Sequence, residues 1–319
     1  MPTNIHDIRR TGEATSALAA VALLLAATAA APVHAQAWVP ASHHGSITVT
    51  YNQAKSTRLT NSDASKVPFG ELIARGLHLG IDYGLTDRLA ISAALPFTSN
   101  RYRGDDPHDP RTLPFPNDQS FIDDGRFHGA WSDWNLSLRY QWLTKPFLVT
   151  PFIGYGQPTH DYTFWAHAAP GSDQWSWQAG VHVGDWLAPP WQNFFWQAGY
   201  TYSFMQPLDH RRVNHGAVSL SAGYTGPRFD VRVELDHRNS YGDTINLPRD
   251  FFNPDGSLNF GNLYYHDQLA AARYTKATIV FDYRISQNYQ VSFSLGRNLS
   301  AANAHLWDYE TRLGISRRF

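Results

Sequence analysis

The stretch that decides the fold runs Trp134-Asn135-Leu136-Ser137-Leu138-Arg139-Tyr140-Gln141-Trp142, with large apolar side chains at every even position and polar side chains at every odd one. Successive side chains of a β-strand point to opposite faces of the sheet. As a strand, this segment therefore has one wholly apolar face and one wholly polar face. No helix-period pattern and no long apolar run stand out after Ala35, so we expect no transmembrane helix.

The same alternation returns along the chain and predicts an all-β, antiparallel fold of about twelve strands. The predicted strands lie near 44–52, 72–83, 88–98, 131–142, 147–155, 174–183, 194–204, 213–224, 228–238, 274–284, 289–296 and 305–319. An even number brings both ends of a barrel to one side, and closure leaves no unpaired backbone groups facing lipid. Ten or fourteen strands fit the same pattern, because the signal of each segment is weak alone.

A soluble β-sandwich alternates in the same way, so alternation alone leaves two fold classes open. Here the polar faces are often charged and the apolar faces end in Trp or Tyr, as in a lipid-facing band around a wet interior. Short and long connections alternate, with long ones near 53–70, 99–130, 156–173 and 239–268. Short periplasmic turns and long outer loops are typical of bacterial barrels. We therefore expect a transmembrane antiparallel β-barrel with an up-and-down meander.

Residues 1–35 have the layout of a cleaved secretory signal peptide. A basic start that includes Arg10 precedes an apolar run over 17–31, and small residues precede a cut after Ala35. The apolar run is too short to cross a bilayer of roughly 30 Å as a helix, and an uncleaved membrane anchor is the alternative. We expect residues 36–319 to form a single barrel domain.

The composition argues against several function classes. The net charge of -1 gives no electrostatic reason to expect nucleic acid as a partner. Without cysteine the chain has no disulfide, no thiol nucleophile and no Cys-ligated zinc. GxSxG, Walker and GxGxxG signatures are absent from the sequence, which gives no support to a soluble enzyme.

Short motifs over most of the predicted barrel domain resemble those of a known barrel family. Residues 82–89 read DYGLTDRL and are followed by the group Leu95-Pro96-Phe97. Residues 133–140 and 156–161 resemble later strand segments, with His160 where Gly is usual. These motifs resemble the outer-membrane "MetA-pathway of phenol degradation" family, whose members are described as transporters, some encoded beside aromatic-degradation genes. The resemblance implies passage of small solutes, including aromatic or hydrophobic ones.

The chain ends in an alternating strand over 313–319 whose last residue is Phe319. Such an ending resembles the signal read by the outer-membrane barrel assembly machinery. Together with the predicted signal peptide, it implies a protein of the Gram-negative outer membrane. Its expected surroundings are outer-membrane lipid and lipopolysaccharide.

The polar faces of the predicted strands would line the barrel interior. The interior candidates are Asp133, Asn135, Arg139, Gln141, Arg232, Glu234, Asp236, Lys276, Asp282, Glu310 and Arg312. Both signs of charge occur in similar numbers, so no strong ion selectivity is expected. One hypothesis is a narrow polar conduit in which the three arginines oppose Glu234, Asp236 and Glu310. The alternative is a salt-bridged plug that fills a small barrel, because buried charges require partners.

Aromatic residues also occur in the expected outer loops, where no lipid-facing strand needs them. The candidates for a solute entrance are Phe115, Phe121, Phe127, Trp131, Phe164 and Trp165. One hypothesis is an apolar entrance for a hydrophobic solute. The alternative is loop packing together with an outer aromatic girdle.

Acidic and histidine side chains in the loops give little support for a metal site. Residues 99–126 hold six aspartates, including Asp123, but without the spacing of an EF-hand, so a solvated outer loop is expected. Four histidines lack the helical spacing and paired carboxylate of a zinc motif. They are His43, His44, His160 and His167. We therefore expect no metal and no cofactor.

Two other function classes stay open beside passive passage of small solutes. A phospholipase-like hydrolase would need His and Ser on one strand face, but parity places His237 with lipid-facing Leu235 and Ser240 on the opposite face. A β-bulge would be needed to bring the two together. The other class is a structural or adhesive barrel that presents its loops to partners. Passage through the lumen, without covalent chemistry, is the favoured hypothesis.

Overall fold

The computed structural model describes residues 37–105, 108–112 and 119–319. The predicted signal peptide and Phe115 lie outside these residues. The strands are β1 (Gly45–Thr60), β2 (Lys66–Gly84), β3 (Leu89–Arg103), β4 (His128–Trp131), β5 (Asp133–Tyr140), β6 (Leu148–Pro158), β7 (Ser176–Trp186), β8 (Phe194–Met205), β9 (Val213–Thr225), β10 (Phe229–Gly242), β11 (Arg273–Arg284), β12 (Tyr289–Ala302) and β13 (Ala304–Arg318). The helical segments are η1 (Arg249–Phe251), α2 (Phe260–Tyr264) and α3 (His266–Leu269). In the described part of the chain, no helix is long and apolar enough to cross a membrane.

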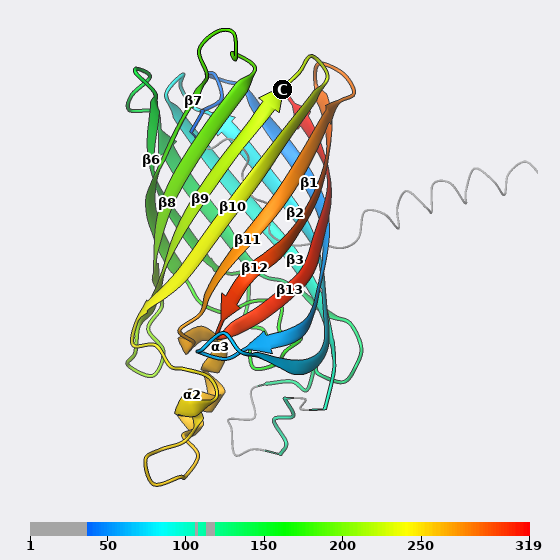
Figure 1. The fold of residues 1–319 in the computed structure, drawn as a ribbon, viewed down its shortest axis with the longest axis vertical. Helices are drawn as coiled ribbons and strands as arrows, with labels where there is room; N and C mark the ends of the chain where they lie inside the picture. Colours follow the sequence, from blue (N-terminus) through cyan, green and yellow to red (C-terminus); the bar gives the residue numbers. More distant parts are fainter. Residues whose placement is uncertain (1–36, 106–107, 113–118) are drawn as a thin grey trace, which may run out of the picture.

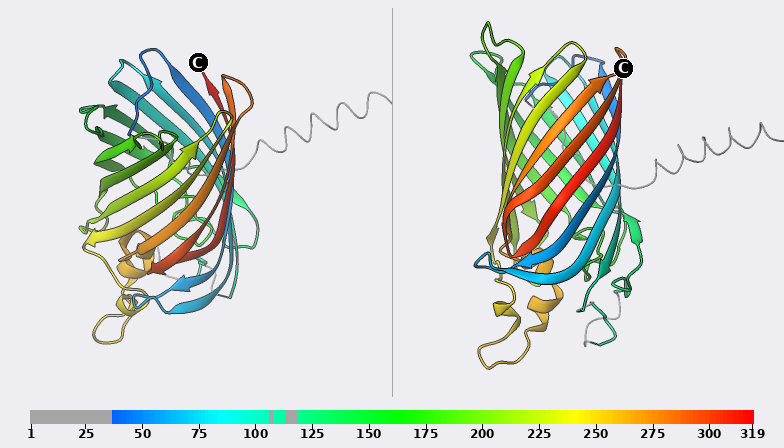
Figure 2. Two further views of the ribbon diagram at one scale, coloured as in Figure 1. Left: turned by 45° about the horizontal axis from the view of Figure 1, so that its top comes forward. Right: turned by 45° about the vertical axis from the view of Figure 1, so that its right-hand side comes forward.

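The strands form one closed antiparallel sheet, drawn as a barrel in Figure 1. Each strand pairs with its neighbours in sequence, and the pairing of β1 with β13 closes the ring (Figure 2). β4 and β5 both pair with β3, one after the other, so they are two pieces of one strand. The barrel therefore has twelve strands, which confirms the predicted architecture. Closure satisfies the backbone groups that an open edge would leave facing lipid.

The interruption between β4 and β5 has a local cause in β3. Residues 97–100 of β3 pair with β4, whereas residues 89–94 pair with β5, and the register shifts between them. Pro96 lies at this point and has no N–H to donate to a neighbouring strand. Its carbonyl still accepts from the N–H of Ser132 at 2.9 Å. The strand predicted as continuous over 131–142 is thus interrupted at Ser132.

The first hairpin extends further than the sequence indicated. Only residues 61–65 connect β1 and β2, so the expected long loop over 53–70 is wrong. Near the tip of this hairpin, charged side chains of the two strands pair with each other. Lys55 of β1, for example, forms an ion pair with Glu71 of β2 at 2.6 Å. Since the outward face carries these charges while Leu72 packs inside, the alternation that marks a lipid-facing strand disappears although the pairing continues.

The outer face of the barrel is an apolar band. Leu136, Val233 and Phe293 on three different strands are 40%, 55% and 46% exposed. Large aromatic residues lie at the strand ends beside the short turns. They are Trp142, Trp191, Phe229, Tyr283, Tyr289 and Phe319. A soluble sandwich would pack such faces together, whereas a barrel in lipid exposes them and adds an aromatic girdle.

Replacing Val233 by Lys tests the lipid-facing assignment. A Lys on the lipid face near mid-membrane lowers the free energy of unfolding by about 2–4 kcal/mol. Leu258→Lys is the control, because Leu258 is exposed in the connection between β10 and β11, beyond the strands. Urea titration of both variants folded in phospholipid vesicles measures the difference. Equal stabilities would contradict the assignment.

Candidate functional site

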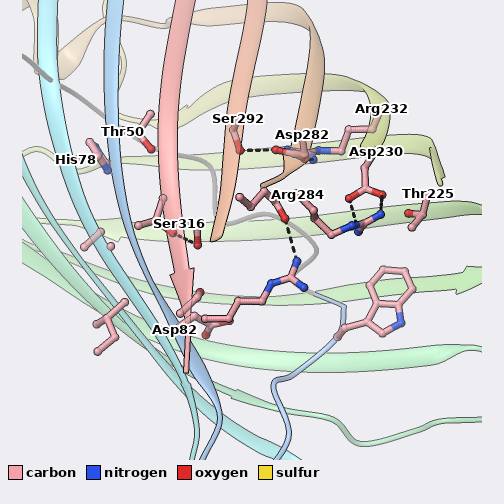
Figure 3. A pocket seen from close by; sticks show the side chains of 18 of the residues that line it. Thr50, His78, Asp82, Thr225, Asp230, Arg232, Asp282, Arg284, Ser292 and Ser316 are labelled. Carbon is pink, nitrogen blue, oxygen red and sulfur yellow. Dashed lines mark hydrogen bonds and ion pairs between the residues drawn. The ribbon is translucent and has the colours of Figure 1, made fainter. Parts of the chain in front are cut away.

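A cavity of about 430 Å³ lies inside the barrel, lined by residues near the short-turn end. Because strand side chains alternate, its walls are the inward positions of each strand, among them Thr50, Asp282 and Ser316. Figure 3 shows these three side chains, which come from one side of the barrel, on the strands β1, β11 and β13. The cavity is the candidate lumen of the protein.

One wall of the cavity is built from an ion-paired group on β10 and β11. The Arg232 guanidinium is nearly buried and donates to Asp282 at 2.5 Å and to Glu234 at 2.7 Å. The hydroxyl of Ser292 donates to Asp282 as well (Figure 3). Each charge thus has partners, which a buried ion requires to offset its lost hydration.

A second ion-paired group lies on β11 and β13. Lys276 donates to Glu310 at 3.0 Å, and the Nε of Arg312 donates to the same carboxylate at 2.6 Å. Asp236 on β10 is directly opposite Lys276 in the strand register. On these strands the interior candidates therefore pair with side chains of opposite charge, and they do not form a ring of one sign.

Arg139 has partners that the sequence did not indicate. Its side chain is 1% exposed and pairs with Asp82 of β2, which also accepts from Ser92 at 2.8 Å. Its other terminal nitrogen donates to the carbonyl of Trp38 at 3.1 Å. Arg139 thus holds the chain before β1, instead of opposing Glu234 across the lumen.

The segment before β1, residues 37–44, enters the barrel interior. Ala37 is fully buried, and its carbonyl accepts from the hydroxyl of Thr150 at 2.7 Å and from Gln141 at 3.3 Å. Its N–H donates to the side chain of Gln197 at 2.9 Å. Polar side chains of β6 and β8, together with Gln141 just after β5, therefore bind a piece of backbone, and this piece narrows the lumen.

Aromatic rings form another wall of the cavity. The ring of Trp38 contacts those of Trp186 and Phe195 edge to face, with centroids 5.8 Å and 6.1 Å away. Trp186 and Phe195 contact each other at 5.4 Å. All three line the cavity. The lumen therefore presents an apolar aromatic surface beside ion-paired polar groups, since Phe195 and Arg232 both pair with Gly223 in the strand register.

The end of the barrel with the long connections is closed by loops that fold inward. Ile122 and Ala166 from two loops pack in one buried cluster with Leu72 and Tyr102, which point inward from β2 and β3. The loop residue Tyr162 donates to Asp133. Asn135, the remaining interior candidate, is half-buried on β5 opposite residue 156.

The five candidate loop aromatics that the structure describes do not gather in one place. Phe164 and Trp165 meet the rings of Tyr264 and Tyr265 beside α2, and Trp165 is almost completely buried. The others are separate. Phe127 lies under the guanidinium of Arg75 at 4.0 Å, Phe121 under Arg111 at 4.9 Å, and Trp131 is 40% exposed against Phe97.

The histidine and serine of the hydrolase alternative do not meet. His237 contacts Thr275 on the outer face at 2.9 Å, whereas Ser240 contacts His215 across β9 and β10 at 3.2 Å. Spacing along one strand could not reveal this second pair, because its members lie on different strands. Within residues 37–105, 108–112 and 119–319, no carboxylate hydrogen-bonds to His215, so the third member of a catalytic triad is absent there.

Several lumen residues were missed by sequence reasoning. They are Trp38, Asp82, Thr150, Trp186, Phe195, Asp230 and Arg284. Asp82 and Asp230 follow the same parity as the predicted residues, and a stricter use of alternation would have found them. Trp38 lies outside any strand, and its place in the lumen depends on contacts with strands far along the chain.

Replacing Asp282 by Asn tests whether the interior charges act as a buried network. Asn keeps the side-chain volume but leaves the Arg232 charge with one carboxylate fewer, so the free energy of unfolding falls by about 3 kcal/mol. Asp255→Asn, at an exposed loop turn, is the control and leaves stability unchanged. Thermal and urea unfolding in detergent compare the two. Equal loss in both variants would show that Asp282 is not part of a tightly coupled buried pair.

No family model matches the sequence, and no curated protein matches it by sequence. The resemblance to the phenol-degradation family therefore stays a prediction. Solved structures do match the fold. An outer membrane channel from Pseudomonas putida F1 is 15% identical, covers 91% of this chain and all of its own, and gives a TM-score of 0.65.

A second similar structure is the translocator domain of the autotransporter NalP from Neisseria meningitidis. It is 10% identical, with 97% of this chain and 96% of that chain covered and a TM-score of 0.52. At these identities the likeness concerns the fold alone. Closure of the twelve strands and the exposed apolar band agree with it. The chain therefore has the fold of an outer-membrane β-barrel channel.

Proposed function

We propose that this protein provides a passive route across the Gram-negative outer membrane for small solutes with an aromatic or hydrophobic part. No covalent chemistry and no cofactor is involved in the passage. The observation that carries the proposal is the cavity of about 430 Å³ inside the barrel, whose wall combines aromatic rings with ion-paired groups. A volume of this size suits one small molecule.

The chemistry of the walls favours an amphipathic solute. The edge-to-face cluster of Trp38, Trp186 and Phe195 offers apolar contact area. The polar groups of the cavity wall, such as Arg232 and Arg284, are paired with carboxylates. They therefore offer hydrogen bonds without a strong net electrostatic field. A small aromatic molecule with a polar substituent fits both surfaces.

The proposal includes the route by which the protein reaches its membrane. Residues 1–35 act as an export signal that is removed, and the strand ending at Phe319 is recognised by the barrel assembly machinery. The exposed apolar band supports contact with membrane lipid, with lipopolysaccharide on the outer side. The long loops then face outward, and the terminal Phe319 faces the periplasm.

A plugged barrel with a structural or adhesive role is the second candidate. Two observations favour it: residues 37–44 occupy part of the lumen, and inward-folded loops close the opposite end. Electrical recordings separate the two functions, because a plugged barrel conducts nothing.

The first experiment measures currents through the purified mature chain in planar bilayers, with benzyl alcohol as the aromatic solute and glucose as a polar solute. We expect small discrete conductance steps that benzyl alcohol interrupts and glucose does not. Trp186→Ala weakens this block roughly three- to tenfold, because an aromatic contact contributes about 0.5–1.5 kcal/mol. Trp177→Ala, on the lipid face, leaves the block unchanged. Equal block in both variants would contradict binding in the cavity.

Deleting residues 37–41 tests the role of the segment inside the barrel. We expect a severalfold larger conductance, because Thr150, Gln141 and Gln197 then face water instead of the segment's backbone. The folded state of the deletion variant is checked by heat-modifiable migration on gels. If both the full mature chain and the folded deletion variant are silent, the structural barrel replaces the channel as the proposed function.

A further inference from the structure

Four imidazole rings and a buried carboxylate gather at the loop-covered end of the barrel. His108 comes from the β3–β4 connection, His167 from the β6–β7 connection, His266 from α3 and His305 from β13. The ring centroids of His108 lie 4.1 Å from His167 and 5.1 Å from His266, and His167 lies 6.2 Å from His305. We call His108, Asp123, His167 and His266 the histidine cluster.

Asp123 is held in place at the centre of the histidine cluster. Its side chain has no exposed area. Its carboxylate oxygens accept hydrogen bonds from the backbone N–H groups of His108 at 3.0 Å, His167 at 3.1 Å and Ala168 at 2.8 Å. Burial alone would raise the pKa of Asp123, but these donors and the His108 ring outweigh it and hold the pKa below its usual range. Two loops are thus folded around one ionised carboxylate.

The ligand atoms lie close to the separation that a metal site requires. One nitrogen each of His108 and His167 and one oxygen of Asp123 all lie within 4.8 Å of one another, and His108 Nδ1 is 3.2 Å from Asp123 Oδ2. Ligands about 2.0–2.1 Å from a tetrahedral zinc ion are about 3.4 Å apart. Small side-chain rotations would therefore bring all three atoms into one coordination sphere.

His266 is prepared to act as a ligand by its own contacts. Its Nδ1 lies 2.7 Å from the carbonyl of Leu263, which only accepts, so Nδ1 carries the proton. Its Nε2 lies 3.4 Å from Oδ1 of Asp267, and a metal ion bound at Nε2 would take the place of this contact. A neutral imidazole whose other nitrogen donates to a carbonyl is the usual arrangement of a metal-binding histidine.

We propose that His108, Asp123 and His167 bind a divalent transition metal ion of the zinc type, with His266 as the fourth ligand. Imidazole nitrogens with one carboxylate suit Zn²⁺, Cu²⁺, Ni²⁺ or Co²⁺ and do not suit Ca²⁺ or Mg²⁺, which take oxygen ligands. Sequence spacing predicts no metal, because the ligands come from three separate connections. The bound ion would crosslink these connections over the mouth of the barrel.

The experiment uses the tag-free mature protein, folded in detergent and treated with a chelator that is then removed. Zinc chloride is titrated by calorimetry, and cobalt chloride is added separately to record visible absorption. We expect one zinc ion per chain at micromolar or tighter affinity, and cobalt bands typical of four-coordinate geometry. A folded wild-type protein that binds no zinc would overturn the proposal.

Matched variants locate the site. His108→Phe keeps a ring for stacking, Asp123→Asn keeps the side-chain volume, and each weakens zinc binding roughly 100-fold or more. His128→Phe and Asp124→Asn are the controls, because these two residues form a partly exposed pair where the same connection enters β4. Heat-modifiable migration verifies folding, and if His108→Phe does not fold, Asp123→Asn decides alone. Zinc binding that is equal in test and control variants would contradict the assignment.

Discussion

The requirement that governs this structure is that every backbone N–H and C=O within lipid must find a partner in the protein. A sheet meets it only by closing on itself, and here the first and last strands, β1 and β13, pair along most of their length. Closure also sets the orientation of the side chains. Apolar residues turn outward, and the charged residues that would be on the surface of a soluble protein meet inside.

The crowded interior explains the chemistry of the site. Charges brought together in a narrow barrel have little water to solvate them, so they are paired, as Arg232 is with Asp282. Three further polar side chains, Thr150, Gln141 and Gln197, bind the backbone of Ala37. The cavity is the space that remains between these groups, and its aromatic wall comes partly from the segment itself.

The parts that the sequence predicts well are those in which one face touches lipid. There apolar and polar residues alternate along each strand, as in Phe229 to Leu235. This alternation predicts the number of strands and which side chains point toward lipid. Where a strand leaves the membrane, as in β1 after Gln53, neither face must be apolar and the pattern fades. Sites assembled from separate connections, such as the contact of His108 with His167, have no local signature, because only folding brings their residues together.

The buried position of Ala37 connects proteolytic processing to the state of the lumen. Its N–H and carbonyl are both bound inside the barrel. The predicted cut after Ala35 would leave one residue, Gln36, in front of it. The choice of cleavage site by the signal peptidase would then decide how much space remains for a solute, and a purification tag placed at this end would act as an added obstruction.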